Sequence, residues 1–224
     1  MVRGVGSSAW AVLLAASQLP ATVVSTPPSP MPTALRGSYG RVGFSSRSLT
    51  NTAEGVFSVN GADLNGDGSP DILLTQRDDN IVSWYENSGS DTFQNIQTIG
   101  SGITVRGPSD AIAVDMDGDG DLDVVVAATY LNDVIWYQNN HGIGTSWTRY
   151  VVDSNLAGVG SVRAADVDND GDMDLIASGT IADGLFWYRN NGAQVFTKVA
   201  IATGSIVDSI GEIQVRLHRH AGIA

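Results

Sequence analysis

The chain has 224 residues, which is enough for one domain with a sizeable hydrophobic core. Its 24 acidic residues against 12 basic ones give a formal net charge of −12. Nucleic acid is therefore excluded as an expected partner, because no basic patch exists to neutralise phosphates. The absence of cysteine excludes disulfides, thiolate metal sites and cysteine nucleophiles.

The N-terminal segment resembles a secretory signal peptide followed by a linker. Arg3 supplies a positive charge and the run 9–16 is apolar, so residues 1–18 are predicted to be a signal peptide. The alternative is an unstructured start with chance apolarity. The run is too short to span a bilayer, so no transmembrane span is expected. Residues 19–40 hold five of the seven prolines and are predicted to form an extended linker. A secreted or extracellular location follows.

Three nine-residue segments, starting at residues 63, 115 and 166, are nearly identical and lie 52 and 51 residues apart. Oxygen-bearing side chains recur at loop positions 1, 3, 5 and 9, glycine recurs at position 6, and position 7 would offer a backbone carbonyl. The predicted ligands are Asp63, Asn65, Asp67, Ser69 and Asp71, then Asp115, Asp117, Asp119, Asp121 and Asp123, then Asp166, Asp168, Asp170, Asp172 and Asp174.

Calcium is the cation that this donor set favours, because it takes six to eight hard oxygen ligands. An ordinary Asp/Gly turn would not require acids at four fixed positions, and carboxylates packed together are unfavourable without a cation. An EF-hand is also disfavoured, since position 12 is Leu74, Val126 or Ala177 and lies within a predicted strand. We expect about three ions, one per loop, which would bring the net charge from −12 to about −6.

Short apolar runs surround each loop at the same spacing. The predicted strands before the loops are 56–62, 110–114 and 159–165, and those after them begin at residues 72, 124 and 175. A Trp-Tyr-x-Asn motif follows, with Trp84, Trp136 and Trp187, and then runs at 93–99, 147–152 and 196–201. Four antiparallel strands per fifty residues predict an all-β fold of β-propeller blades. The blade units are about 53–104, 105–155 and 156–207, with a partial one from 208.

The three tryptophans could stack on sugars or fill the space between blades. We favour packing between blades, because large residues repeat there by structural need. Adjacent Trp and Tyr side chains point to opposite faces of a strand, so only one of each pair can reach a given interface.

An aspartate loop between two strands, followed by Trp-Tyr-x-Asn at a fifty-residue period, resembles the FG-GAP/VCBS repeats, which also build the propeller of integrin α subunits. The resemblance covers residues 41–216 and is closest to the VCBS-like branch. It implies calcium at loop positions 1, 3, 5 and 9. It also implies cell adhesion, or recognition of an extracellular protein or glycan. The alternatives are a lectin with sugar pockets between blades and an accessory propeller fragment of a secreted polysaccharide-active enzyme.

A fourth loop is due at about residue 217, but residues 217–224 are a divergent tail. We expect three full repeats with partial flanking ones, an incomplete propeller whose chain is truncated or frameshifted after residue 216. Open sheet edges would then invite association.

No catalytic set is predicted. His141, His218 and His220 recur in no context, and only three glutamates, Glu54, Glu86 and Glu212, occur. The aspartates are assigned to calcium, so a lyase or hydrolase is the less favoured reading.

Overall fold

The computed structural model describes residues 55–89, 93–182 and 184–204. These residues form no α-helix; one 3-10 turn, Gly102–Thr104, joins the first two sheets. No helix among them is long and apolar enough to cross a membrane. The predicted signal peptide, the linker, the partial unit from residue 208 and the tail lie outside the described residues.

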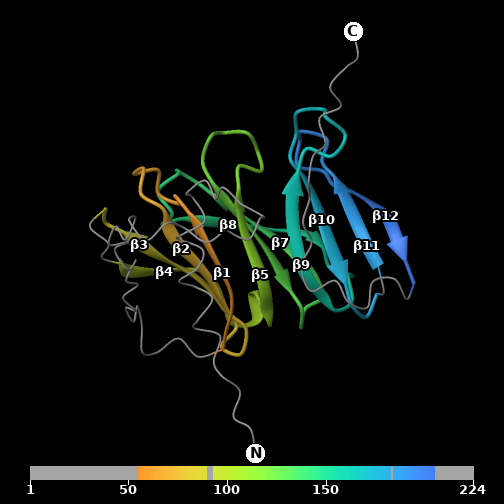
Figure 1. Ribbon diagram of the computed structural model, residues 1–224, viewed down its shortest axis with the longest axis horizontal. Coiled ribbons are helices and arrows are strands. Elements are labelled where there is room, and N and C mark those ends of the chain that lie inside the picture. The colour runs from red at the N-terminus through yellow and green to blue at the C-terminus, as the bar shows by residue number, and fades with distance from the viewer. Residues whose placement is uncertain (1–54, 90–92, 183, 205–224) are drawn as a thin grey trace, which may run out of the picture. The chain divides into compact units, whose positions relative to one another are not determined.

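Twelve strands form three four-stranded antiparallel sheets that follow one another along the chain (Figure 1). The first sheet has the order β1-β2-β3-β4, with bounds Val56–Ala62, Asp71–Gln76, Ile81–Asn87 and Phe93–Ser101. The order is that of the chain, so each strand pairs with the one before it. Short connections therefore suffice, as the fifty-residue repeat predicts.

The other two sheets repeat this arrangement. The second contains β5 (Pro108–Val114), β6 (Asp123–Ala128), β7 (Asp133–Asn139) and β8 (Trp147–Asp153). The third contains β9 (Val159–Ala165), β10 (Asp174–Gly179), β11 (Gly184–Arg189) and β12 (Thr197–Thr203). The all-β prediction of four-stranded blades is confirmed. The last strand was expected from residue 196 but begins at Thr197, where its pairing with Arg189 starts.

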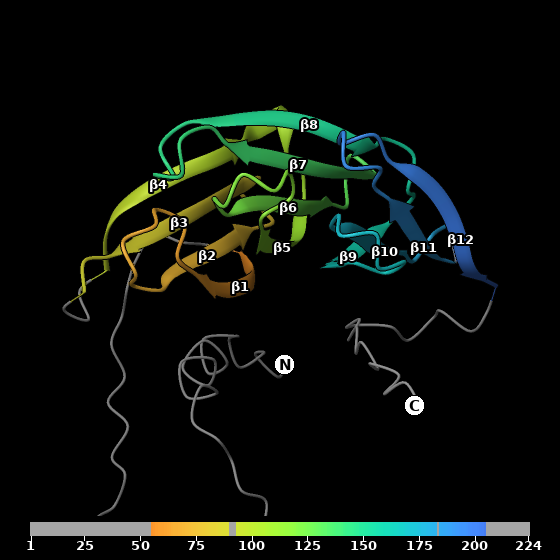
Figure 2. The ribbon, with the colours of Figure 1, turned by 90° about the horizontal axis from the view of Figure 1, so that it is seen from above.

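Each sheet packs face to face on the next, and the three form an open array (Figure 2). The Trp-bearing face of one sheet meets the Tyr-bearing face of its successor. Trp84 contributes to the first core with Tyr137, and Trp136 contributes to the second with Tyr188. Trp84 and Trp136 are only 1% and 3% exposed. The predicted packing role of these two tryptophans is confirmed, whereas Trp187 is only partly buried.

Asp110 on β5 links all three sheets. Its Oδ1 accepts a hydrogen bond from Ser58 of β1 at 3.1 Å, and its Oδ2 lies 2.6 Å from Nη1 of Arg163 on β9. The hydroxyl of Ser161 donates to the same Oδ2 at 3.0 Å. One buried carboxylate therefore ties the first strands of neighbouring blades together.

Candidate metal centre

Each aspartate loop connects the first two strands of its sheet, and its position 9 aspartate begins the second strand. Asp71, Asp123 and Asp174 are buried. In the second loop, Asp123 accepts hydrogen bonds from the backbone N–H of Asn139 at 2.8 Å and of Met116 at 3.2 Å. The other two loops repeat this pair of contacts. The position 9 carboxylate therefore fastens the loop to the last residue of the third strand of its own sheet or, in the third blade, to the residue that follows it.

The position 1 carboxylate folds each loop back on itself. The backbone N–H of the position 6 glycine donates to it at 2.8 Å in the first loop and 3.1 Å in the other two. Gly68, Gly120 and Gly171 have φ of +86°, +95° and +98°, in the left-handed region that disfavours other residues. The glycine predicted to allow a sharp turn is thus required by the backbone.

Position 5 is also held by the loop backbone. The N–H of Ser69 donates to Asp67 at 2.7 Å, that of Asp121 to Asp119 at 2.9 Å, and that of Asp172 to Asp170 at 3.1 Å. These contacts orient the position 5 carboxylates before any ion binds. The predicted use of the position 7 carbonyl stays a prediction.

In each of two loops, three carboxylates lie close enough together to bind one cation. Oxygen atoms of Asp115, Asp117 and Asp119 lie within 4.8 Å of one another, as do those of Asp166, Asp168 and Asp174. The first loop brings together fewer acids because position 3 is Asn65. Its amide Nδ2 instead donates to Asp67 at 3.3 Å.

Burial and mutual repulsion disfavour the charged form of several loop carboxyls. Burial raises the pKa of Asp123 to about 6, and it also raises the pKa of Asp71. The pKa of Asp117 is raised by burial first and then by the charge of Asp119. A bound cation would favour the ionised forms, so the electrostatics of the loops suit a metal.

The residue after each Trp-Tyr pair was not singled out from the sequence, yet it bears on the loops. Gln138 donates from Nε2 to Oδ2 of Asp117 at 2.5 Å. Arg189, the equivalent residue of the third blade, places Nε 2.6 Å from Oδ2 of Asp168. Glu86 of the first blade accepts a hydrogen bond from Asn95 instead. The varying position inside the repeated motif was the available signal.

A groove of about 370 Å³ lies between the second and third blades. Strands β7 and β8 line one side of it with Trp136, Gln138 and Tyr150, and Ala193, Gln194 and Phe196 line the other. Trp136 and Tyr150 are stacked with ring centroids 4.7 Å apart. The groove touches the second loop through Gln138 and through the Trp136 indole, whose N–H donates to Asp123 at 2.9 Å.

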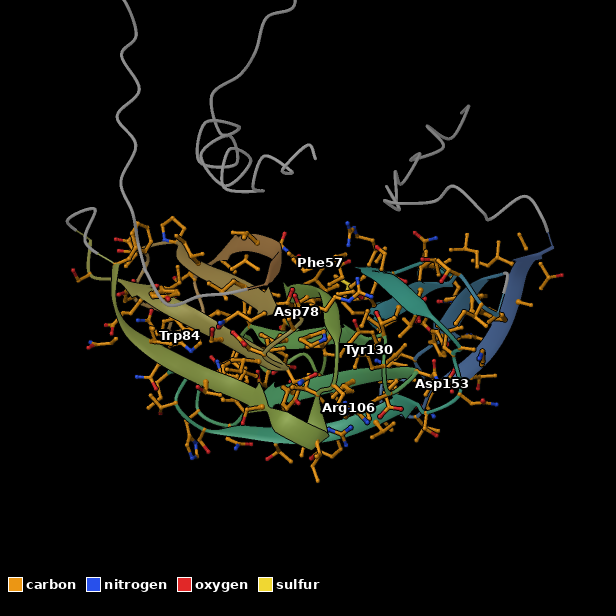
Figure 3. The ribbon with its side chains drawn as sticks, turned by 90° about the horizontal axis from the view of Figure 1, so that it is seen from below. Phe57, Asp78, Trp84, Arg106, Tyr130 and Asp153 are labelled. Atoms are coloured by element: carbon orange, nitrogen blue, oxygen red, sulfur yellow. The ribbon has the colours of Figure 1, made fainter. Side chains whose placement is uncertain are left out.

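A second cluster that sequence reasoning missed joins the first two blades. The guanidinium of Arg77 lies over the rings of Phe57 and Tyr130, at 4.8 and 5.1 Å from their centroids. Both aromatic residues are labelled in Figure 3. Both rings are largely exposed. No repeated motif marks these residues, so the spacing of the sequence could not reveal them.

The histidines offer no catalytic geometry in the part of the chain that the structure describes. His141 is exposed and makes no hydrogen bond with an acidic side chain there. His218, His220, Glu54 and Glu212 lie outside the described residues. The expectation of a non-catalytic protein stays a prediction.

Known proteins contain repeats similar to the one in this chain. The model of the FG-GAP-like repeat matches residues 63–126 and 115–177. No curated protein matches the chain. One similar solved structure is that of an Agrocybe aegerita lectin, described as specifically recognising non-reducing terminal N-acetylglucosamine. It is 19% identical over 69% of this chain and 40% of the lectin chain, with a TM-score of 0.46. The chain thus spans about two fifths of that structure's length. By its two matched repeats, the chain belongs to the FG-GAP-like repeat family.

Proposed function

We propose that this protein is a secreted, non-catalytic recognition module whose blades are stabilised by calcium bound in the three aspartate loops. The observation that carries the proposal is the repeated loop geometry. In every loop the backbone holds the carboxylates of positions 1, 5 and 9 in the same way. A turn that served only to reverse the chain would not need these acids at each repeat.

The donor atoms present fit a hard cation. Each loop offers only oxygen ligands, which calcium prefers, and two loops bring three carboxylates within 4.8 Å of one another. Both carboxylate oxygens of Asp168 are shielded from solvent and accept no hydrogen bond, and among the described residues only Oδ2 has an ionic contact, with Arg189. Buried polar atoms normally have a partner, so Oδ1 of Asp168 suits a cation ligand.

Within this proposal the side chains at positions 1, 3, 5 and 9 would hold the ion. When bound, calcium supplies positive charge that compensates the crowded carboxylates. The protein's own contribution is to position them: Asp123 accepts a hydrogen bond from Asn139 on β7, while the rest of the second loop turns at Gly120. Ion binding would therefore connect the first three strands of a blade.

Calorimetric titration of the full chain with calcium tests this proposal. We expect about three ions per chain, and each occupied site adds about 2.7 kcal/mol of stability when free calcium is 100-fold above its Kd. Asp67→Asn, Asp119→Asn and Asp170→Asn together are expected to weaken binding in all three loops. A melting temperature that is the same in excess calcium and in chelator would contradict the proposal.

A sugar is the second candidate ligand, and the groove between the second and third blades favours it. Tyr150 is 43% exposed and stacks on Trp136, while Gln138 and Gln194 place amide groups nearby. An exposed aromatic ring beside amides suits the apolar face and hydroxyls of a sugar ring. Trp136 itself is buried, so Tyr150 is the better residue to change.

Glycan-array binding by the wild-type chain and Tyr150→Ala tests the sugar reading. We expect any glycan bound by the wild type to be lost in the variant, with the melting temperature nearly unchanged. Ile103→Ala is the matched control, since Ile103 is an exposed apolar residue that does not line the groove. Binding that survives Tyr150→Ala would place recognition elsewhere and favour an extracellular protein partner.

A further inference from the structure

The three blades place chemically different side chains at one equivalent position beside the aspartate loops. This position follows the Trp-Tyr pair and holds Glu86, Gln138 or Arg189. Only the third blade places a cation there. Arg189 Nε lies 2.6 Å from Oδ2 of Asp168, and its Nη2 lies 3.7 Å from Oδ2 of Asp170. Positions 3 and 5 of the third loop, two expected calcium ligands, therefore face a positively charged side chain.

The contact with Asp168 can be given up readily. Neither oxygen of Asp168 accepts an aligned hydrogen bond, so the interaction with Arg189 is ionic. The Arg189 side chain is 54% exposed, and its guanidinium can return to water at little cost. In the second loop the neutral Gln138 makes a hydrogen bond to Asp117 and brings no charge.

We infer that Arg189 is a tethered cation that competes with calcium for the third loop and sets that loop's affinity below that of the second. The inference rests on the proposed calcium function. Both loops carry aspartate at positions 1, 3, 5 and 9, so their carboxylate charges are equal. Arg189 reduces the net negative charge of the third site from −4 to −3. Because calcium affinity follows the charge of the ligand set, the loops fill in sequence rather than together.

The consequence is a graded response to calcium within one chain. When calcium is scarce, the third loop keeps a counter-charge in Arg189, whereas no cationic side chain of the described residues pairs with the carboxylates of the second loop. As calcium rises, the second loop fills first. Filling of the third loop then requires Arg189 to leave Asp168, so a positive side chain becomes free on β11 at high calcium only.

Exchanging the two side chains tests the inference. Calcium titration by calorimetry would be performed on the full chain in two backgrounds, both of which carry Asp63→Asn and Asp67→Asn to silence the first loop. The first background adds Asp115→Asn and Asp119→Asn, so that only the third loop binds. The second adds Asp166→Asn and Asp170→Asn, so that only the second loop binds. In the first background, Arg189→Gln is expected to tighten binding to the third loop on the order of tenfold. In the second, Gln138→Arg is expected to weaken binding to the second loop by a similar factor.

Glu86→Gln is the matched control, because it changes one charge at the equivalent position of a blade whose side chain contacts Asn95. It should leave the third loop's affinity unchanged. A second readout needs no silenced loops: the Arg189 Nε–H resonance in the wild-type chain should shift and exchange faster with water as calcium fills the third loop.

The outcomes separate the inference from the proposal beneath it. If no loop binds calcium, the proposed function and the inference both fail. If the loops bind calcium but Arg189→Gln leaves the third loop's affinity unchanged, or the Arg189 resonance does not respond, only the inference is overturned. Tighter binding in Arg189→Gln together with weaker binding in Gln138→Arg establishes it.

Discussion

The two interfaces between neighbouring blades use equivalent strands, yet among the described residues a loop of the second blade covers Trp84 at the first, whereas a groove borders Trp136 at the second. At the first, the Trp84 indole donates to the carbonyl of Gly144 at 3.0 Å, and Asn139 donates to the carbonyl of Leu64 at 3.0 Å. At the second, Trp136 stacks on Tyr150 of its own sheet and borders the groove. Trp84 and Trp136 occupy equivalent positions in their blades, but the residues around them differ.

The length of one connection accounts for the difference. Tyr137 pairs with Arg149, twelve residues later, whereas Tyr188 pairs with Lys198, ten residues later. The longer connection of the second blade reaches back over Trp84 and supplies Gly144. The shorter connection of the third blade does not fill the equivalent space over Trp136. Identical repeats therefore yield different surfaces where their turns differ in length.

The largest expected effect comes from removing the Trp84 indole at the first interface. Trp84→Ala should destabilise the protein by about 3–5 kcal/mol, because a fully buried aromatic side chain leaves a cavity. Trp136→Ala should cost less, since the groove already borders that ring. Denaturant unfolding measures both. Equal losses of unfolding free energy in the two variants would show that Trp136 is packed as tightly as Trp84 despite the groove.

Asp110 serves both interfaces, so its removal should weaken both. Asp110→Ala is expected to cost about 2–4 kcal/mol, because Arg163 loses its partner in a partly buried site. Ser161→Ala removes one hydrogen bond to the same carboxylate and should cost only about 1 kcal/mol. Denaturant unfolding of the two variants, side by side, checks this ratio, and similar losses would contradict the role of Asp110 as a link.

A methyl group tests how tightly the longer connection covers Trp84. A Cβ added at Gly144 would lie 2.5 Å from Cζ2 of Trp84, whereas one added at Gly102 would meet nothing within 4 Å. Both glycines have similar positive φ, +67° and +63°. Gly102→Ala should therefore cost about 1 kcal/mol of backbone strain, and Gly144→Ala about 1–3 kcal/mol more. Equal melting temperatures for the two variants would mean that the connection leaves room for a methyl group beside Trp84.

The smallest expected effect lies at the outer edge of the second interface. Asp153 Oδ2 accepts from Lys198 Nζ and from the Tyr188 hydroxyl, both at 2.7 Å. Burial raises the pKa of Asp153, but the hydrogen bonds from Lys198 and Tyr188 outweigh it, so the pKa is lowered from 3.8. Lys198→Met should cost about 0.5–1 kcal/mol near neutral pH.

The pH dependence of that variant follows from the lowered pKa. Stabilisation by Asp153 is present above its unfolded value of 3.8 and is lost as the pH falls through the lower folded value. The difference in melting temperature between wild type and Lys198→Met should therefore shrink below about pH 4. A difference that stays constant into strong acid would assign the effect to the lost contact of the lysine ammonium with the Phe186 ring.

Much of the fold could be predicted because each blade repeats one local pattern. The short apolar runs that begin at Ile72, Val124 and Leu175 identified the second strands, and the Trp-Tyr pairs identified the third strands with their two faces. The loop positions were equally local, since Asp-x-Asp-x-Asp-Gly spacing alone implies inward-turned oxygens. Side chains that act between elements were not predictable in this way.

What the sequence by itself determined is the repeat: three loops, four strands per unit and the identity of the packing tryptophans. These features depend on residues close together in the chain, where spacing and chemistry are visible directly. Only the tertiary structure decided that Arg189 faces Asp168, that Asp110 joins three sheets, and that a groove lies beside Trp136. Those contacts depend on the register of paired strands and on the length of a connection, so residues far apart meet only after the blades have packed.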